Sequence, residues 1–202
     1  MHSFIALGDS YTIGEGVAES ERWPRQLAAR LRNAGLELGD PQIVARTGWT
    51  TDELATALDA EGLAPPYALV TLLIGVNDQY RGRGLDAYRA QFHGLLQRAV
   101  GLAGGDAARV VVVSIPDWGV TPFARAEHRD AREVADQINA FNAEARVQAG
   151  RAGAAWVDVT GISRSADAGT ELVADGLHPS GAQYTRWSEA ILPAARAALT
   201  IA

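Results

Sequence analysis

The 202-residue sequence contains no cysteine. This absence excludes disulfide bonds, thiolate metal sites and cysteine nucleophiles. It does not decide the cellular compartment, because a secreted protein can also lack cysteine.

Long apolar runs and clusters of basic residues are also missing. No stretch approaches the roughly 20 apolar residues that a membrane-spanning helix needs, and the apolar run of residues 4–7 is too short for a signal peptide. The formal net charge is -6 with scattered arginines, which argues against a sequence-independent nucleic-acid binder. We therefore expect a cytoplasmic protein without a nucleic-acid partner or stable membrane insertion. A precursor trimmed of a targeting segment would give the same sequence.

The chain does contain an alternation of strand and helix patterns. Short apolar, often β-branched segments predict strands at 4–7, 42–45, 68–74, 109–115 and 154–159. Segments with helical spacing predict helices at 23–33, 51–63, 85–102, 127–148 and 181–199. The last of these helices begins with Ser180 and Gln183 at the spacing of a capping box. Residues 1–202 are a suitable length for one domain.

Five strands separated by helices predict an α/β fold, in which a parallel sheet has helices on both faces. In such open sheets, ligands bind outside the carboxyl ends of the strands. Four polar segments follow predicted strands, at residues 8–11, 47–49, 75–78 and 175–179. Each alone has an ordinary explanation as a turn or a helix cap, but together they supply the parts of one reaction centre.

A serine hydroxyl, an imidazole and a carboxylate occur among these segments. Ser10 is the candidate nucleophile, and a serine needs a base to remove its proton during attack. His178 is the candidate base. Asp175 lies three residues before His178, where a tight turn helped by Gly176 lets its carboxylate hold one ring nitrogen. These three residues predict a catalytic triad.

Attack on a carbonyl creates an oxyanion, which needs fixed hydrogen-bond donors. Three donors are available: the backbone N–H of Ser10, the backbone N–H of Gly48 and the side-chain amide of Asn77. Glycine lets the main chain approach a substrate closely, and asparagine donates without adding charge.

These residues resemble the sequence blocks of the SGNH hydrolases in the GDSL esterase/lipase superfamily. The first block reads Gly8-Asp9-Ser10-Tyr11, with tyrosine where the eponymous motif has leucine. The glycine of the second block matches Gly48. The third block matches residues 75–78, and the last block matches residues 175–179. The resemblance implies a three-layer α/β/α sandwich similar to flavodoxin with a five-stranded parallel sheet, a Ser-His-Asp triad and no cofactor.

Several other patterns are incomplete. The nucleophile elbow of α/β-hydrolases needs Gly-x-Ser-x-Gly, but position 12 is Thr12. A dinucleotide fingerprint starting at Gly14 fails at Glu19. A metal hydrolase needs more ligands than Asp175 and His178 supply, so no metal site is expected.

Several residues beside the blocks are expected to be structural. Asp9 and Asp78 are expected to hold their turns through backbone hydrogen bonds. No role is assigned to His2, His93 or His128.

The sequence favours a serine esterase that forms an acyl-Ser10 intermediate on small soluble or short-chain esters. Its substrate is expected to touch residues that adjoin the blocks: Tyr11, Ile13, Trp49, Val76, Tyr80, Trp118 and Leu177. Trp49 and Trp118 could equally pack against the domain itself. A small-molecule-binding module without catalysis is the alternative, since one fold can serve both functions. The natural substrate, acyl length, leaving group and oligomeric state are left open.

Overall fold

The computed structural model describes residues 1–165 and 171–200, and five parallel strands form its centre. The strands are β1 (Phe4–Gly8), β2 (Gln42–Ala45), β3 (Leu69–Leu73), β4 (Val110–Val113) and β5 (Ala155–Val157). They pair in the order β2-β1-β3-β4-β5, and every pairing is parallel. The predicted parallel sheet is confirmed.

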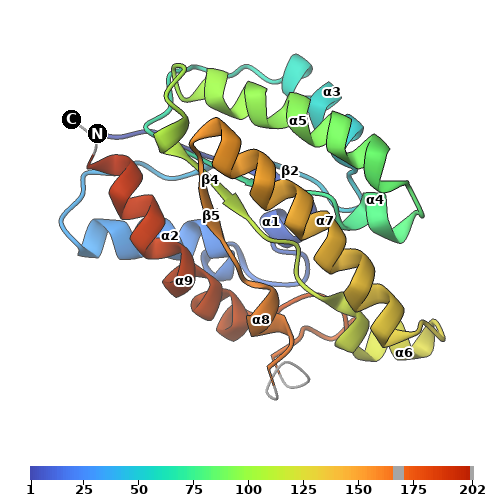
Figure 1. Cartoon of the computed structure of the whole chain (residues 1–202). Helices are drawn as coiled ribbons and strands as arrows, with labels where there is room; N and C mark the ends of the chain where they lie inside the picture. Colours follow the sequence, from blue (N-terminus) through green and yellow to red (C-terminus); the bar gives the residue numbers. More distant parts are fainter. Residues whose placement is uncertain (166–170, 201–202) are drawn as a thin grey trace.

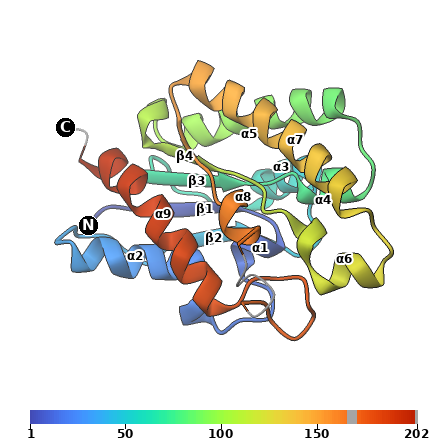
Figure 2. The same ribbon diagram turned by 60° about the horizontal axis from the view of Figure 1, so that its bottom comes forward.

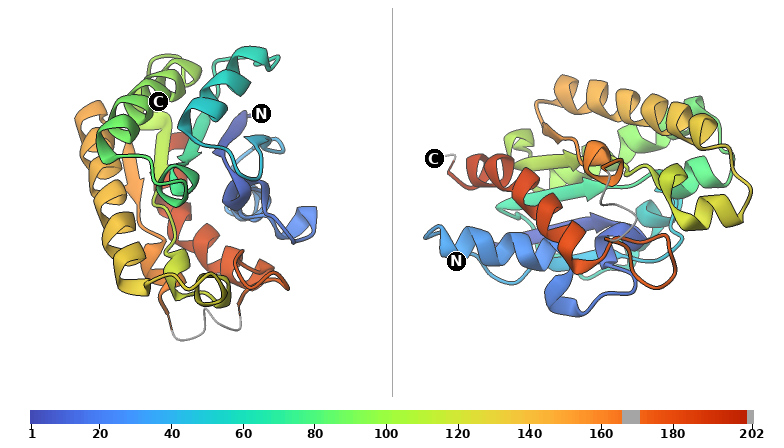
Figure 3. Two further views of the ribbon diagram at one scale, coloured as in Figure 1. Left: turned by 90° about the vertical axis from the view of Figure 1, so that its right-hand side faces the viewer. Right: turned by 90° about the horizontal axis from the view of Figure 1, so that it is seen from below.

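Helices cover both faces of this sheet and give three layers (Figure 1, Figure 2). On one face, α2 (Trp23–Asn33) packs against α9 (Gly181–Leu199). The opposite face is covered by α3 (Thr51–Ala60), α5 (Leu85–Leu102) and α7 (Ala131–Ala152). Figure 3 shows α2 and α9 on the other side of the strands from α5 and α7. The predicted α/β/α sandwich is therefore also confirmed.

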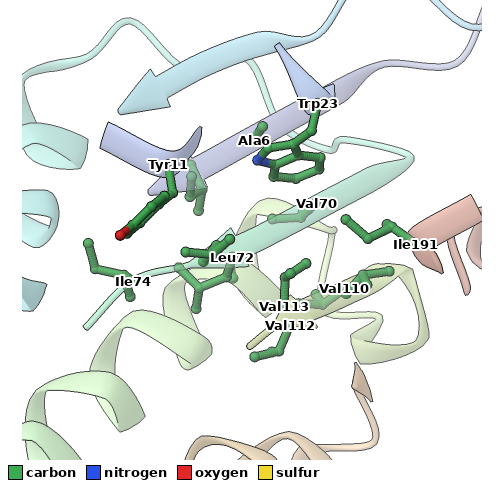
Figure 4. Close-up of a cluster of buried hydrophobic side chains, with 14 of the residues drawn as sticks. Ala6, Tyr11, Trp23, Val70, Leu72, Ile74, Val110, Val112, Val113 and Ile191 are labelled. Carbon is green, nitrogen blue, oxygen red and sulfur yellow. The ribbon is translucent and has the colours of Figure 1, made fainter. Parts of the chain in front are cut away.

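The core lies between these layers. All residues of β1, β3 and β4 are buried, as expected for strands covered on both faces. Trp23 of α2 and Ile191 of α9 are fully buried beside the sheet (Figure 4). Burying one such side chain contributes about 1.5–3 kcal/mol, so the sheet is a stable base for the loops at its edges.

Short helices follow the carboxyl ends of the strands and gather at one edge of the sheet (Figure 2). They are α1 (Ser10–Ile13) after β1, α4 (Val76–Tyr80) after β3, α6 (Pro122–Ala126) after β4 and α8 (Thr160–Ser163) after β5. The chain leaves β1 toward α2 on one face and leaves β3 toward α5 on the other. This reversal between β1 and β3 creates the crevice in which such folds bind ligands.

The helix predicted at 127–148 is displaced in the structure. It begins at Ala131, because the side chain of Asp130 accepts hydrogen bonds from the N–H groups of Arg132 and Glu133 and caps the helix there. It runs past Gly150 and ends at Ala152, where Gly153 adopts a left-handed φ of 82°.

Side-chain bonds also shorten two predicted strands. β4 ends at Val113, and the backbone N–H and C=O of Ile115 both bond the buried side-chain amide of Asn142. β5 ends at Val157, and the N–H of Val159 donates to the Ser114 hydroxyl at 2.8 Å. These bonds replace sheet pairing at the edge where the candidate site lies.

Two helix ends differ from the expected ones as well. α3 stops at Ala60 rather than at residue 63. At the start of α9, the side chain of Ser180 makes no capping hydrogen bond. Gln183 instead donates to the carbonyl of Glu171 at 3.3 Å, so the capping box is not formed. None of the described helices is both long and apolar enough to span a bilayer.

Candidate active site

Ser10 is the first residue of α1, directly beyond the end of β1. Asp9 caps this short helix by accepting a hydrogen bond from the Tyr11 N–H at 3.0 Å. Asp9 therefore holds its own turn, as expected from the sequence. The side chain of Ser10 is left at the crevice between β1 and β3, and the residue is 5% exposed.

Asp175 and His178 form a short hydrogen bond within one loop. The Oδ2 atom of Asp175 lies 2.6 Å from Nδ1 of His178. The other carboxylate oxygen accepts from the N–H groups of Leu177 at 2.8 Å and His178 at 3.0 Å. Burial alone would raise the pKa of Asp175, but these hydrogen bonds outweigh it and hold that pKa below its usual value. The carboxylate is therefore ionised at neutral pH.

Backbone bonds close the loop that carries this pair. The N–H of Val173 donates to the carbonyl of His178 at 2.9 Å, and the N–H of Ser180 donates to the carbonyl of Glu171 at 2.8 Å. The ring of Tyr11 packs beside the imidazole, with 5.4 Å between ring centroids. Both effects limit the movement of His178, which is 7% exposed.

Ser10 and His178 line the same pocket. Within residues 1–165 and 171–200, the Ser10 hydroxyl makes no hydrogen bond to the imidazole. The structure thus brings the candidate nucleophile and base to one cavity without joining them. Catalytic hydrogen bonds are often long before substrate binds and shorten in the complex.

The candidate oxyanion donors reach this pocket from three segments. Ser10, Gly48 and Asn77 all line it. Neither the Ser10 N–H nor the Gly48 N–H donates to another backbone group in the described chain, so both remain available to a ligand. The Nδ2 atom of Asn77 donates one hydrogen bond to the carbonyl of Trp49 at 2.9 Å, which leaves its second hydrogen free.

The backbone at Gly75 explains how Asn77 comes to lie here. Gly75 caps α4 with a φ of 126°, a conformation that other residues rarely adopt. A Cβ atom at this position would lie 2.5 Å from the ring of Tyr88. Glycine therefore lets the chain turn sharply from β3 into the helix that carries Asn77.

Asp78 links two segments instead of holding its own turn. Its carboxylate accepts from the backbone N–H of Thr51 at 3.0 Å and from the Thr51 hydroxyl at 2.8 Å. Burial raises the pKa of Asp78, and the bonds to Thr51 partly oppose that effect. The result is that α4 is tied to the start of α3 beneath the candidate site.

The pocket has a volume of about 140 Å³. Of the residues predicted to touch substrate, five line it and two, Ile13 and Trp49, do not. The five that line it are Tyr11, Val76, Tyr80, Trp118 and Leu177. Trp49 is half-buried against the core. Thr47 and Phe123 also line the pocket, but neither was predicted to touch substrate. Both follow the carboxyl end of a strand, where ligands bind in open parallel sheets, so this rule could have identified them.

Three aromatic side chains form one wall of the pocket. The ring of Tyr80 lies edge-on to that of Trp118 at 5.4 Å, and Phe123 lies 6.3 Å from Trp118. The indole N–H of Trp118 donates to Gln79 at 2.7 Å, so this buried ring has its polar atom satisfied. The wall is therefore aromatic and mostly apolar.

The part of the chain that the structure describes contains no group of three or more His, Asp or Glu side chains placed to hold a metal ion.

Comparison with known proteins identifies a family for this sequence. Residues 6–186 match the GDSL-like Lipase/Acylhydrolase family. No curated protein sequence matches the chain.

Solved structures share the fold at low identity. A lipase/acylhydrolase from Enterococcus faecalis is 20% identical, with a TM-score of 0.74 over 96% of this chain and 94% of that one. TesA is 22% identical, with a TM-score of 0.74 over 98% of this chain and 100% of that one. The psychrotrophic esterase EstA from Pseudoalteromonas sp. is 15% identical, with a TM-score of 0.68 over 98% and 94%. Since the family match spans most of the sequence, the chain belongs to the GDSL-like Lipase/Acylhydrolase family and is a carboxylic ester hydrolase.

Proposed function

We propose that the chain hydrolyses small soluble or short-chain esters through a covalent acyl-Ser10 intermediate. One observation carries the proposal: the Asp175–His178 pair and Ser10 line one pocket together with Gly48 and Asn77. A nucleophile, a base with an orienting acid, and oxyanion donors are the groups that acyl transfer requires.

The predicted steps follow from the hydrogen bonds. Asp175 holds Nδ1 of His178, so Nε2 is the nitrogen available to Ser10. Nε2 removes the proton of Ser10 as its oxygen attacks the ester carbonyl, and His178 then gives that proton to the leaving alcohol. The same nitrogen then takes a proton from a water molecule, whose oxygen attacks the acyl carbon. His178 returns this proton to the Ser10 oxygen as the bond to the acyl group breaks, which releases the acid and free Ser10.

The N–H groups of Ser10 and Gly48 and the amide of Asn77 are proposed to bind the oxyanion. The two backbone groups have no backbone acceptor among the described residues. Donors that are already oriented stabilise the developing charge without reorganisation during the reaction.

The proposed preference for short acyl groups rests on the size of the pocket. Its volume of about 140 Å³ is well below the roughly 300–1,000 Å³ of pockets that take drug-sized ligands. The aromatic wall of Tyr80, Trp118 and Phe123 suits an apolar group of limited length. A panel of aryl esters graded by acyl length should therefore give its highest kcat/KM at short chains and a steep fall beyond them.

A fluorophosphonate label tests the nucleophile directly. EstA has been solved in a form inhibited by monoethylphosphonate, and phosphonates of this kind react with activated serines. Wild-type protein should take up one label, and Ser10→Ala should take up none and lose ester turnover. Ser20→Ala changes an exposed serine outside the pocket and is the matched control, which should label normally. Retention of most activity by Ser10→Ala would refute the assignment.

A further inference from the structure

Arg81 lies immediately after α4, four residues beyond Asn77. Its backbone N–H donates to the backbone carbonyl of Asn77 at 3.0 Å. Its guanidinium group reaches a different segment. The Nη2 atom donates to the carbonyl of Gly48 at 2.6 Å, and Nη1 lies 3.3 Å from a carboxylate oxygen of Glu53. Arg81 therefore joins the helix that carries one candidate oxyanion donor to the turn that carries another.

The turn at residues 46–49 has two possible states. The N–H of Trp49 donates to the carbonyl of Arg46 at 3.2 Å, and Gly48 has a φ of 85°. Gly48 is the third residue of this turn, and Thr47, the second residue, does not have a positive φ. A positive φ at the third position but not at the second is typical of a type II turn. A type I turn differs from it by rotation of the middle peptide, which here contains the N–H of Gly48. That rotation would aim the N–H away from its present direction, and glycine permits both states.

Two successive carbonyls of this turn are held by α4 and the residue after it. Arg81 donates to the carbonyl of Gly48, and Asn77 donates to that of Trp49. The guanidinium lies so close to the turn that a Cβ atom on Gly48 would be 3.7 Å from Nη2. Without Arg81, only the amide of Asn77 would join α4 to these carbonyls, and that amide is itself a candidate oxyanion donor.

Resting on the proposed function, we infer that Arg81 is a positioning residue for the oxyanion hole. It holds the turn against α4, and so keeps the N–H of Gly48 and the amide of Asn77 aimed at one point. The ion pair with Glu53 keeps the guanidinium turned toward the carbonyl. Arg81 does not line the pocket, and its effect on the reaction passes through Gly48.

Arg81→Ala should lower kcat by about 10-fold to 100-fold with little change in KM. A misplacement of a catalytic group by about 1 Å can lower the rate 10²-fold. Complete loss of one oxyanion donor lowers kcat by about 10²–10³-fold, so a donor that is only less well held should lower kcat by less. Guanidinium ions added below their denaturing concentration should restore part of kcat in Arg81→Ala. A residue that served folding alone would not give this rescue.

Arg98 offers a matched control. Its guanidinium makes the same kind of contact at the far end of α3, donating to the carbonyl of Ala55 at 2.8 Å and to Asp59 at 2.6 Å. Arg98→Ala should keep kcat and should not respond to guanidinium. Arg81→Lys keeps the charge but not the fork that spans Gly48 and Glu53, so its kcat should be intermediate.

The inference is overturned if kcat in Arg81→Ala stays within about 2-fold of wild type, if guanidinium gives no rescue, or if Arg98→Ala loses kcat equally. If Arg81→Ala does not fold, Arg81→Lys decides: a lower kcat with unchanged KM supports the inference, and an unchanged kcat refutes it. Failure of the proposed function is a separate result, because Ser10→Ala would then remain active.

Discussion

Replacement of Asp9 by asparagine is expected to remove a large part of the pH dependence of stability between about pH 4 and pH 8. Asp9 is fully buried, and its Oδ2 atom has no hydrogen-bond partner among the described residues. Burial raises the pKa of Asp9 from its ordinary value of 3.8 to about 8; the Tyr11 N–H opposes this shift and the nearby charge of Asp78 adds to it. The folded protein therefore holds a proton on Asp9 that the unfolded chain releases.

The sign and size of the effect follow from that difference. Below about pH 4 the group is protonated in both states, and above about pH 8 it is ionised in both. Between these values the unfolded state binds fewer protons, so the free energy of unfolding falls as the pH rises. A pKa difference of about four pH units, at about 1.4 kcal/mol for each, gives a loss of up to about 6 kcal/mol. That is a large share of the roughly 5–15 kcal/mol that stabilises an ordinary domain.

Asparagine can still accept from the Tyr11 N–H, but it cannot ionise. The protonated carboxyl of the wild type also carries an O–H without a partner at Oδ2, so the exchange for an amide costs little while Asp9 is neutral. Asp9→Asn should therefore be close to wild type in stability near pH 4.5 and clearly more stable than wild type near pH 9.

Urea unfolding at half-unit steps from pH 4.5 to pH 9.5 tests this reasoning. The difference between the two proteins isolates Asp9, because the other titrating groups are common to both. Parallel curves across this range would refute the argument, since they would mean that Asp9 ionises alike in the folded and unfolded states.

Three further predictions concern the site and its support. Asp175→Asn should lower kcat on the order of 10⁴-fold, because the amide favours the wrong imidazole tautomer, while circular dichroism remains unchanged; a loss below 10-fold would contradict the triad. Asn77→Ala should lower kcat by roughly 10²–10³-fold, and an effect confined to KM would remove Asn77 from the oxyanion role. Asn142→Leu leaves the buried N–H of Ile115 without an acceptor, while the C=O of Ile115 keeps the Thr160 hydroxyl as a donor; it should lower the free energy of unfolding by about 1–3 kcal/mol, measured by urea unfolding. Asn139→Leu, on the exposed side of the same helix, is the control and should change it by less than about 1 kcal/mol.

Local patterns in the sequence determined which segments form the strands and helices of the three layers. They also determined which short segments carry the candidate site residues. Strand and helix patterns reflect interactions between residues that are near one another in the sequence. The β-branched run at 110–113 forms β4, and the segment with helical spacing at 85–102 forms α5. Asp175 and His178 lie three residues apart, so a single turn decides their contact. The triad roles and the assignment of residues 1–202 to one domain stay predictions.

Packing between distant segments decided the rest. Phe123 lines the pocket because contacts with other parts of the chain place α6 beside it. Ile13 and Trp49 adjoin the candidate site in the sequence but do not line the pocket. The contact between Arg81 and Gly48 spans 33 residues, and no local pattern marks it.

The pKa of Asp9 is also decided by packing between distant segments. The sequence places this carboxyl group in a turn beside Ser10, where an exposed aspartate would be ionised. Its burial requires the sheet and the surrounding layers to close over it. Desolvation is a property of everything packed around a group, so only the tertiary structure could decide its charge.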